Sequence, residues 1–129
     1  MTILARSPAQ AQAAVDALRA GVVNRFIARH FTYGRGAELR KVEAGVRKSE
    51  GSAQVVVGGY GVGKSHLCEV LALRLMAAGY AVAHLEMGAS HGRAENPRGV
   101  LRTIGQNLRV QIADRVFTGE SEISLLLRA

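Results

Sequence analysis

The most constraining feature of this 129-residue sequence is a glycine-rich octapeptide, residues 58–65, between two apolar stretches of different period. The stretch before it, residues 54–57, is a short valine-rich run typical of a strand buried on both faces of a sheet. The stretch after it predicts a helix, because apolar residues recur three and four positions apart, at Leu67, Val70, Leu71, Leu75 and Ala78. We therefore expect strand, tight loop and helix in that order.

A second strand is predicted over residues 80–87, after a helix end at Gly79. Strand, helix and strand make one right-handed βαβ unit. Because residues 58–65 also match the phosphate-loop pattern G-x-x-x-x-G-K-[ST], the fold class expected is α/β, a P-loop NTPase-like parallel sheet with flanking helices that is incomplete in this chain. The expected domains are an N-terminal helical segment, residues 1–52, that leads into the core and a partial nucleotide-binding domain, residues 53–129.

Capping patterns predict the remaining helices. Ser7-Pro8 and Asn96-Pro97 each place a capping side chain before proline, and Gly21 is a predicted helix end. Residues 24–33 form either a second short helix or an irregular packed segment. After a break at residues 34–36, the apolar stripe of an amphipathic helix follows at Leu39, Val42 and Val46.

The C-terminal part contains one more predicted helix. It begins after Asn96 and is expected to continue through Ile112 and Val116 until a break at residues 118–120. Another apolar segment begins at Ser121. Its apolar end favours a chain that continues beyond this sequence.

The octapeptide fits G-x-x-x-x-G-K-[ST], the Walker A pattern of loops that cradle phosphates. Glycines allow a close approach of backbone to phosphate, and the following helix N-terminus presents N–H groups to an anion. Lys64 is the candidate catalytic residue, with its ammonium on the β- and γ-phosphates, and Ser65 is the candidate Mg²⁺ ligand. The expected cofactors are ATP and Mg²⁺. The candidate binding residues are Gly58, Gly59, Tyr60, Gly61, Val62, Gly63, Lys64, Ser65 and His66.

The carboxylate that a complete ATPase needs is not visible in the sequence. A Walker B strand is apolar and ends in an acidic residue that holds Mg²⁺ through water and activates the attacking water. Glu86 ends the second predicted strand, but a role as a loop anchor there is favoured over one in Mg²⁺ binding. The later acids follow no apolar strand run; they are Glu95, Asp114, Glu120 and Glu122. The sequence therefore leaves open whether this chain hydrolyses ATP.

Charge and composition narrow the classes of partner that this chain is expected to bind. The net charge is +7, and most of the basic residues are arginine, which favours polyanions such as nucleotides or nucleic acids. The sequence has no apolar run long enough for a membrane span and no secretory signal pattern, so a cytoplasmic protein without a membrane partner is expected. The single cysteine, Cys68, is expected to be a small buried residue.

Four segments together resemble a known family. They are residues 18–23, Gly34-Arg35 with Glu38-Leu39, residues 57–67 and residues 79–83. They look like the N-terminal part of the ATP-binding proteins of bacterial BREX-type phage-defence systems, which resemble AAA+ and origin-recognition-like P-loop ATPases. The resemblance runs from about Ala17 to about Leu108.

The resemblance implies ATP binding and hydrolysis with Mg²⁺ in a cytoplasmic, DNA-linked defence assembly. It implies that Gly58 to Ser65 form the phosphate-binding loop and that Gly34, Arg35 and Glu38 lie near the adenine. Family members are longer, with Walker B, sensor and winged-helix regions that this sequence does not show. The partners left open are DNA, other defence-system proteins and further copies of the chain.

Two other functions remain open at this stage. The arginine excess is compatible with a nucleic-acid-binding or scaffolding module in which nucleotide acts as a switch. A small-molecule kinase also shares the Walker A pattern, and Arg93 and Arg98 would then imitate the arginine-rich lid of such enzymes.

Overall fold

The structure is a computed structural model that describes residues 7–48, 51, 53–86, 96–113 and 115–126. It divides into two compact units, Met1–Leu73 and Arg74–Ala129, which we describe separately. Several predictions fall outside the described residues: most of the turn at 49–52, the end of the second strand at Met87, the candidate residues Arg93, Glu95 and Asp114, and residues 127–129. The domain boundary after residue 52 stays a prediction.

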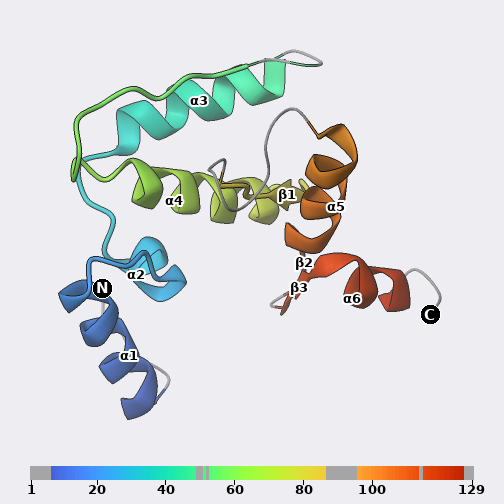
Figure 1. The fold of residues 1–129 in the computed structure, drawn as a ribbon. Coiled ribbons are helices and arrows are strands. Elements are labelled where there is room, and N and C mark those ends of the chain that lie inside the picture. The colour runs from blue at the N-terminus through green and yellow to red at the C-terminus, as the bar shows by residue number, and fades with distance from the viewer. Residues whose placement is uncertain (1–6, 49–50, 52, 87–95, 114, 127–129) are drawn as a thin grey trace. The chain divides into compact units, whose positions relative to one another are not determined.

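The first unit contains α1 (Pro8–Arg19), α2 (Arg25–His30), α3 (Gly36–Lys48) and the start of α4 (Lys64–Ala77) (Figure 1). The predicted start of α1 is confirmed, because the Ser7 side chain accepts a hydrogen bond from the Gln10 N–H. Asn24 caps α2 in the same way through the Phe26 N–H. Residues 24–33 therefore contain a short helix rather than an irregular segment.

The end of α1 is a Schellman motif built on Gly21. The Val22 N–H bonds to the Ala17 carbonyl at 2.9 Å, and the Gly21 N–H bonds to the Leu18 carbonyl at 3.2 Å. Gly21 has φ of +64°, a left-handed conformation that costs a residue with a Cβ atom about 1 kcal/mol. This turn folds Val22 back beside the last turn of α1.

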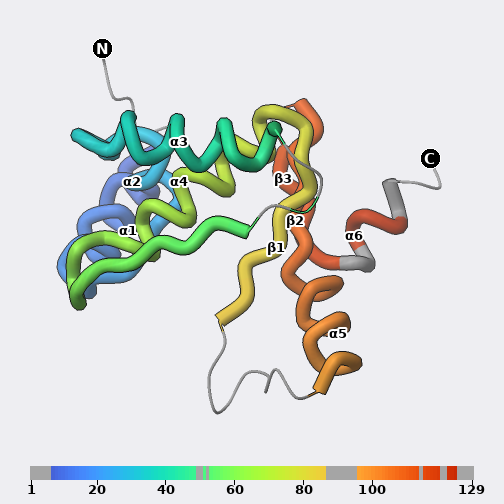
Figure 2. The backbone as a smooth tube through the Cα atoms, turned by 90° about the horizontal axis from the view of Figure 1, so that it is seen from above, coloured from blue at the N-terminus to red at the C-terminus, as the bar shows by residue number. Residues whose placement is uncertain are grey.

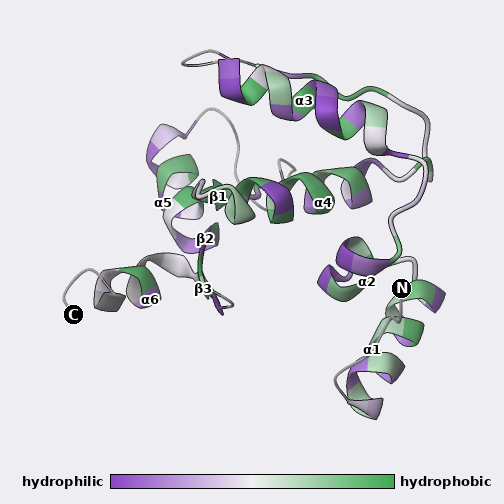
Figure 3. Cartoon of the chain, turned by 180° about the vertical axis from the view of Figure 1, so that it is seen from behind, coloured by the Kyte–Doolittle hydropathy of each residue, from purple (hydrophilic) through white to green (hydrophobic). Residues whose placement is uncertain are grey.

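A small apolar core joins three helices of the first unit. Ala28 of α2, Leu39 of α3, and Leu67 and Val70 of α4 form one buried cluster. Leu39 is 1% exposed, and burial of a leucine side chain stabilises a fold by roughly 1.5–3 kcal/mol. Figures 1 and 2 show α3 running alongside the first turns of α4. Hydrophobic and hydrophilic residues alternate along α3 in Figure 3, as predicted for an amphipathic helix.

The strand predicted over residues 54–57 is not present. This segment has no regular secondary structure, and Val55 and Val57 are 85% and 88% exposed. A strand exists only through pairing of its N–H and C=O groups, and the described part of the chain pairs no strand with this segment. The Gln54 side chain instead lies against Gly45 of α3, where a Cβ atom would be 2.5 Å from Gln54 Nε2.

The second unit contains a three-stranded antiparallel sheet in the order β1-β2-β3. Its strands are β1 (Val82–Ala83), β2 (Leu108–Ile112) and β3 (Arg115–Thr118). Val82 pairs with Arg109, and Ile112 pairs with Arg115 across the β2–β3 hairpin. The α/β class therefore holds, but the predicted parallel sheet and right-handed βαβ unit are wrong.

Two helices accompany this sheet, α5 (Pro97–Asn107) and α6 (Gly119–Leu126). Asn96 caps α5 as predicted, because its side chain accepts a hydrogen bond from the Gly99 N–H. The Glu122 carboxylate accepts a hydrogen bond from the Thr118 N–H at the start of α6. No helix in the described part of the chain is long and apolar enough to cross a membrane.

The predicted continuation of the helix through Ile112 and Val116 is wrong. The helix ends at Asn107, and Leu108 already has an extended ψ of 129°. The apolar residues that follow keep helical spacing, but β-branched residues dominate them and pack well on a sheet. Ala113 has φ of +52° where the chain turns, which no helix interior permits.

Candidate functional site

Two glycines of the glycine-rich loop have a left-handed backbone. Gly61 and Gly63 have φ of +78° and +86°, in the left-handed region that glycine adopts without cost. The Leu67 N–H donates to the Gly63 carbonyl at 2.9 Å, so helical bonding begins at the end of the loop. The first N–H groups of α4 have no partner within the helix, which makes this end of α4 a place for an anion.

Lys64, the first residue of α4, folds back over the loop. Its Nζ atom donates to the Gly58 carbonyl at 3.0 Å and to the Gly59 carbonyl at 2.6 Å. A Cβ atom at Gly58 would lie 2.9 Å from Val62 Cγ2, so this turn also needs a glycine. The ammonium is thus already at the loop, held by neutral acceptors.

Ser65 and His66 follow on the same first turn of α4. Ser65 is exposed, which leaves its hydroxyl accessible to a ligand. His66 Nε2 lies 2.9 Å from the Thr32 hydroxyl, which itself donates to the Ala28 carbonyl at 2.7 Å. The Thr32 hydroxyl thus contacts both the Ala28 carbonyl and the His66 ring, which joins the first turn of α4 to the residues that follow α2.

Arg35 contacts the loop from the residue before α3. Its Nη2 atom donates to the Val62 carbonyl at 2.6 Å, and its Nη1 atom lies 3.4 Å from Glu38 Oε1. The resemblance placed Gly34, Arg35 and Glu38 near the adenine. In the structure none of these three residues lines the pocket beside the loop.

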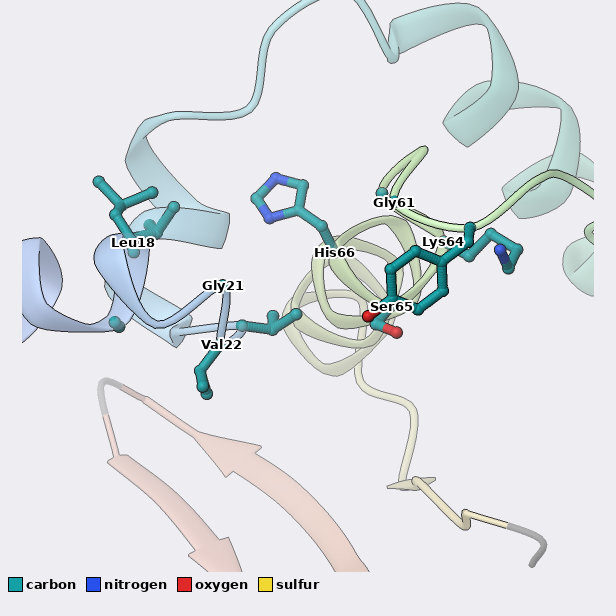
Figure 4. Close-up of a pocket in the computed structure, with 12 residues that line it drawn as sticks. Leu18, Gly21, Val22, Gly61, Lys64, Ser65 and His66 are labelled. Carbon is teal, nitrogen blue, oxygen red and sulfur yellow. The ribbon is translucent and has the colours of Figure 1, made fainter.

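A pocket of about 540 Å³ lies beside the loop within the first unit. The loop and the start of α4 form one side, and apolar residues from α1, α2 and their connection form the other. Figure 4 shows the His66 ring between Leu18 and Gly61. The lining residues are Ala17, Leu18, Gly21, Val22, Val23, Ile27, Tyr60, Gly61, Gly63, Lys64, Ser65 and His66.

The apolar side of this pocket was not predicted. Leu18 and Val22 lie in residues 18–23, which carried part of the resemblance but were given no place in a binding site. The Schellman motif is the signal that could have placed them, because it fixes the direction in which the chain leaves α1. An ion pair between Arg25 Nε and Glu69 Oε1, 3.6 Å apart, joins α2 to α4 and holds this side of the pocket near the loop.

Other predicted residues lie elsewhere. Glu86 is exposed and follows the end of β1. Glu122 contacts the backbone at the start of α6, as described above. Cys68 is exposed on α4, which corrects its expected burial: the helix turns its neighbours Leu67 and Val70 to the core and Cys68 away.

A comparison with known protein families finds a match for this chain. The family model described as BREX system ATP-binding protein BrxC/D matches residues 7–117. Neither a curated protein nor a solved structure gives a significant match. The match covers most of the chain, including the loop and the apolar side of the pocket. The chain therefore belongs to the BrxC/D family of BREX system ATP-binding proteins.

Proposed function

We propose that this chain binds Mg·ATP in the pocket beside the glycine-rich loop, as the nucleotide-binding part of a BREX phage-defence ATPase. The observation that carries the proposal is the two-sided pocket, with a cationic glycine loop and helix N-terminus opposite an apolar wall. A nucleoside triphosphate has the same two-sided chemistry, with an anionic chain at one end and a flat base at the other.

The loop side suits the triphosphate. Gly61 and Gly63 have the left-handed φ that lets successive N–H groups face one concavity. Lys64 holds its ammonium on two carbonyls of the same loop, within reach of any anion that enters. When phosphates bind, this ammonium would exchange neutral carbonyl oxygens for charged oxygens, which form stronger hydrogen bonds.

The exposed Ser65 hydroxyl is the proposed Mg²⁺ ligand. A hydroxyl oxygen is a hard donor of the type that Mg²⁺ prefers, and the ion commonly completes its coordination with water and phosphate oxygens. Bound there, Mg²⁺ would neutralise charge on the phosphates. Ser65 directly follows Lys64, so both residues belong to the first turn of α4.

The apolar side suits the adenosine. Leu18, Val22 and Ile27 offer a wall for the faces of a base, and the pocket volume lies within the usual range for small ligands. His66 also lines this pocket, and its ring nitrogens are able to form hydrogen bonds with polar groups of the ligand. Hydrolysis would need a carboxylate in addition, and its assignment stays a prediction, as do cytoplasmic location and DNA or protein partners.

Isothermal titration calorimetry with the non-hydrolysable analogue AMP-PNP and Mg²⁺ tests the proposal. We expect Lys64→Ala to weaken binding about 10- to 100-fold, the order of one hydrogen bond between charged groups. Lys41→Ala is the matched control, because Lys41 is exposed on α3 and its removal changes the net charge equally. Equal affinity of wild type and Lys64→Ala would contradict the role given to the loop.

A competition series separates the two sides of the pocket. Inorganic tripolyphosphate with Mg²⁺ should displace the analogue and lose affinity in Lys64→Ala. Adenosine should compete more weakly and be insensitive to Lys64→Ala, but lose affinity in Val22→Ser. If tripolyphosphate does not compete, the phosphates do not bind at the loop.

A further inference from the structure

We propose that Arg35 is a positioning residue that turns the Gly63 N–H toward the phosphates by holding the Val62 carbonyl on the opposite side. This inference rests on the proposed function, since it gives that site one more determinant. The resemblance placed Arg35 near the adenine, whereas this inference gives it a role at the phosphate side of the site.

The contact that carries the inference is short and direct. Arg35 Nη2 donates to the Val62 carbonyl oxygen at 2.6 Å, which is shorter than a typical N–H···O bond. Neither Val62 nor Arg35 lines the pocket, whereas Gly61 and Gly63 do, so the carbonyl is bonded to a side chain outside the pocket lining. The carbonyl is therefore drawn to the side of the loop that faces away from the pocket.

The geometry of the peptide unit converts this contact into an orientation. The Val62–Gly63 peptide is trans and planar, so its C=O and N–H bonds point in opposite directions. A hydrogen bond that holds the carbonyl away from the pocket directs the Gly63 N–H into it. Gly63, at φ of +86°, has no Cβ and would otherwise rotate more freely than any other residue.

Arg35 is itself fixed to the core. Its carbonyl accepts the first helical hydrogen bond of α3 from the Leu39 N–H at 3.1 Å, and Leu39 is 1% exposed. Its Nη1 atom lies near the Glu38 carboxylate, which neutralises part of its charge. The backbone of Arg35 is therefore bonded to buried Leu39, while its side chain is bonded to the loop.

Selective isotope labelling makes the contact observable in the whole chain. The sequence contains two Val-Gly pairs, Val57-Gly58 and Val62-Gly63, so ¹³C-carbonyl valine with ¹⁵N-glycine gives one signal for each. We expect Arg35→Met to shift the Val62-Gly63 signal in the ligand-free protein and to leave the Val57-Gly58 signal in place. Arg40→Met is the matched control, because Arg40 is exposed on α3, the helix that follows Arg35, and carries the same charge.

Titration with inorganic tripolyphosphate and Mg²⁺ measures the consequence. We expect about tenfold weaker binding by Arg35→Met, the order of one lost hydrogen bond to a charged group, and partial recovery in Arg35→Lys. Adenosine should bind equally to wild type, Arg35→Met, Arg35→Lys and the Arg40→Met control, because the contact between Arg35 and Val62 acts on the phosphate side of the pocket.

The outcomes are distinct. An unmoved Val62-Gly63 signal in ligand-free Arg35→Met overturns the positioning role of Arg35, even if phosphate binding falls, because Arg35 would then act on the ligand directly. Equal tripolyphosphate affinity in wild type and Arg35→Met overturns this inference and leaves the proposed function standing. A wild-type chain that does not bind tripolyphosphate overturns both.

Discussion

The two units of the molecule are stabilised in different ways. In Met1–Leu73, capped helices bury a small cluster between them, and the loop is fixed by single side chains such as Lys64 and Arg35. In Arg74–Ala129, the sheet pairs Val82 with Arg109, far apart in the sequence. Binding should therefore be sensitive to single atoms in the first unit, and stability to turn and register in the second.

The largest effect should come from the core of the first unit. We expect Leu39→Ala to lower the free energy of unfolding by about 2–5 kcal/mol, because it removes a fully buried side chain and leaves a cavity. Urea unfolding followed by circular dichroism measures it. Leu101→Ala, at a leucine 67% exposed on α5, should change stability by less than about 0.5 kcal/mol. Similar losses in both variants would contradict the description of the core.

The next effect should appear in the loop. Gly63→Ala places a Cβ at a φ of +86°, which costs about 1–2 kcal/mol in backbone strain and distorts the anion site. We expect loss of AMP-PNP binding by calorimetry. Gly59→Ala is the control in the same loop, since Gly59 has no left-handed φ and its added Cβ would meet only Val62 Cγ1 at 4.0 Å. If both variants bind equally, the left-handed loop is not required.

A smaller change, of opposite sign, should arise in the second unit. Ala113 has a left-handed φ of +52° where β2 ends, so Ala113→Gly should relieve strain and raise stability by up to about 1 kcal/mol. Thermal unfolding would show it as a higher melting temperature. Unchanged AMP-PNP affinity is expected, and a fall in affinity would show that turn and site are coupled.

The smallest effect should be at Cys68. Its side chain is exposed, so Cys68→Ala should change the free energy of unfolding by less than about 0.5 kcal/mol. The native thiol should react with Ellman's reagent at the rate of an accessible cysteine. Protection until the protein is unfolded would restore the burial expected from the sequence.

Local signals made much of the first unit predictable. Ser7-Pro8 and Gly21 marked the two ends of α1 correctly, because capping depends on a few neighbouring residues. The left-handed backbone at the loop glycines was equally predictable, because glycine is the residue that adopts this conformation without cost. Capping also predicted the start of α5 in the second unit.

Pairing and long-range packing were not predictable from the sequence. Residues 54–57 have the composition of a strand, but composition does not tell whether another strand pairs with them. The apolar spacing through Ile112 and Val116 fits a helix as well as a hairpin, and the contact with β1 decides between them. The pocket wall at Leu18 and Val22 depends on how α1 turns at Gly21, which a periodic pattern does not encode.

The two carbonyls that hold Lys64 have a consequence for selectivity among ligands. Its ammonium is already engaged at 2.6 and 3.0 Å, so an incoming anion must outcompete these oxygens rather than fill a vacant charge. A monovalent anion gains little from that exchange, whereas a polyphosphate offers several charged oxygens at once. Under the proposed function, chloride and acetate should leave the Lys64 ammonium on these carbonyls, and only a chain of phosphates should displace it.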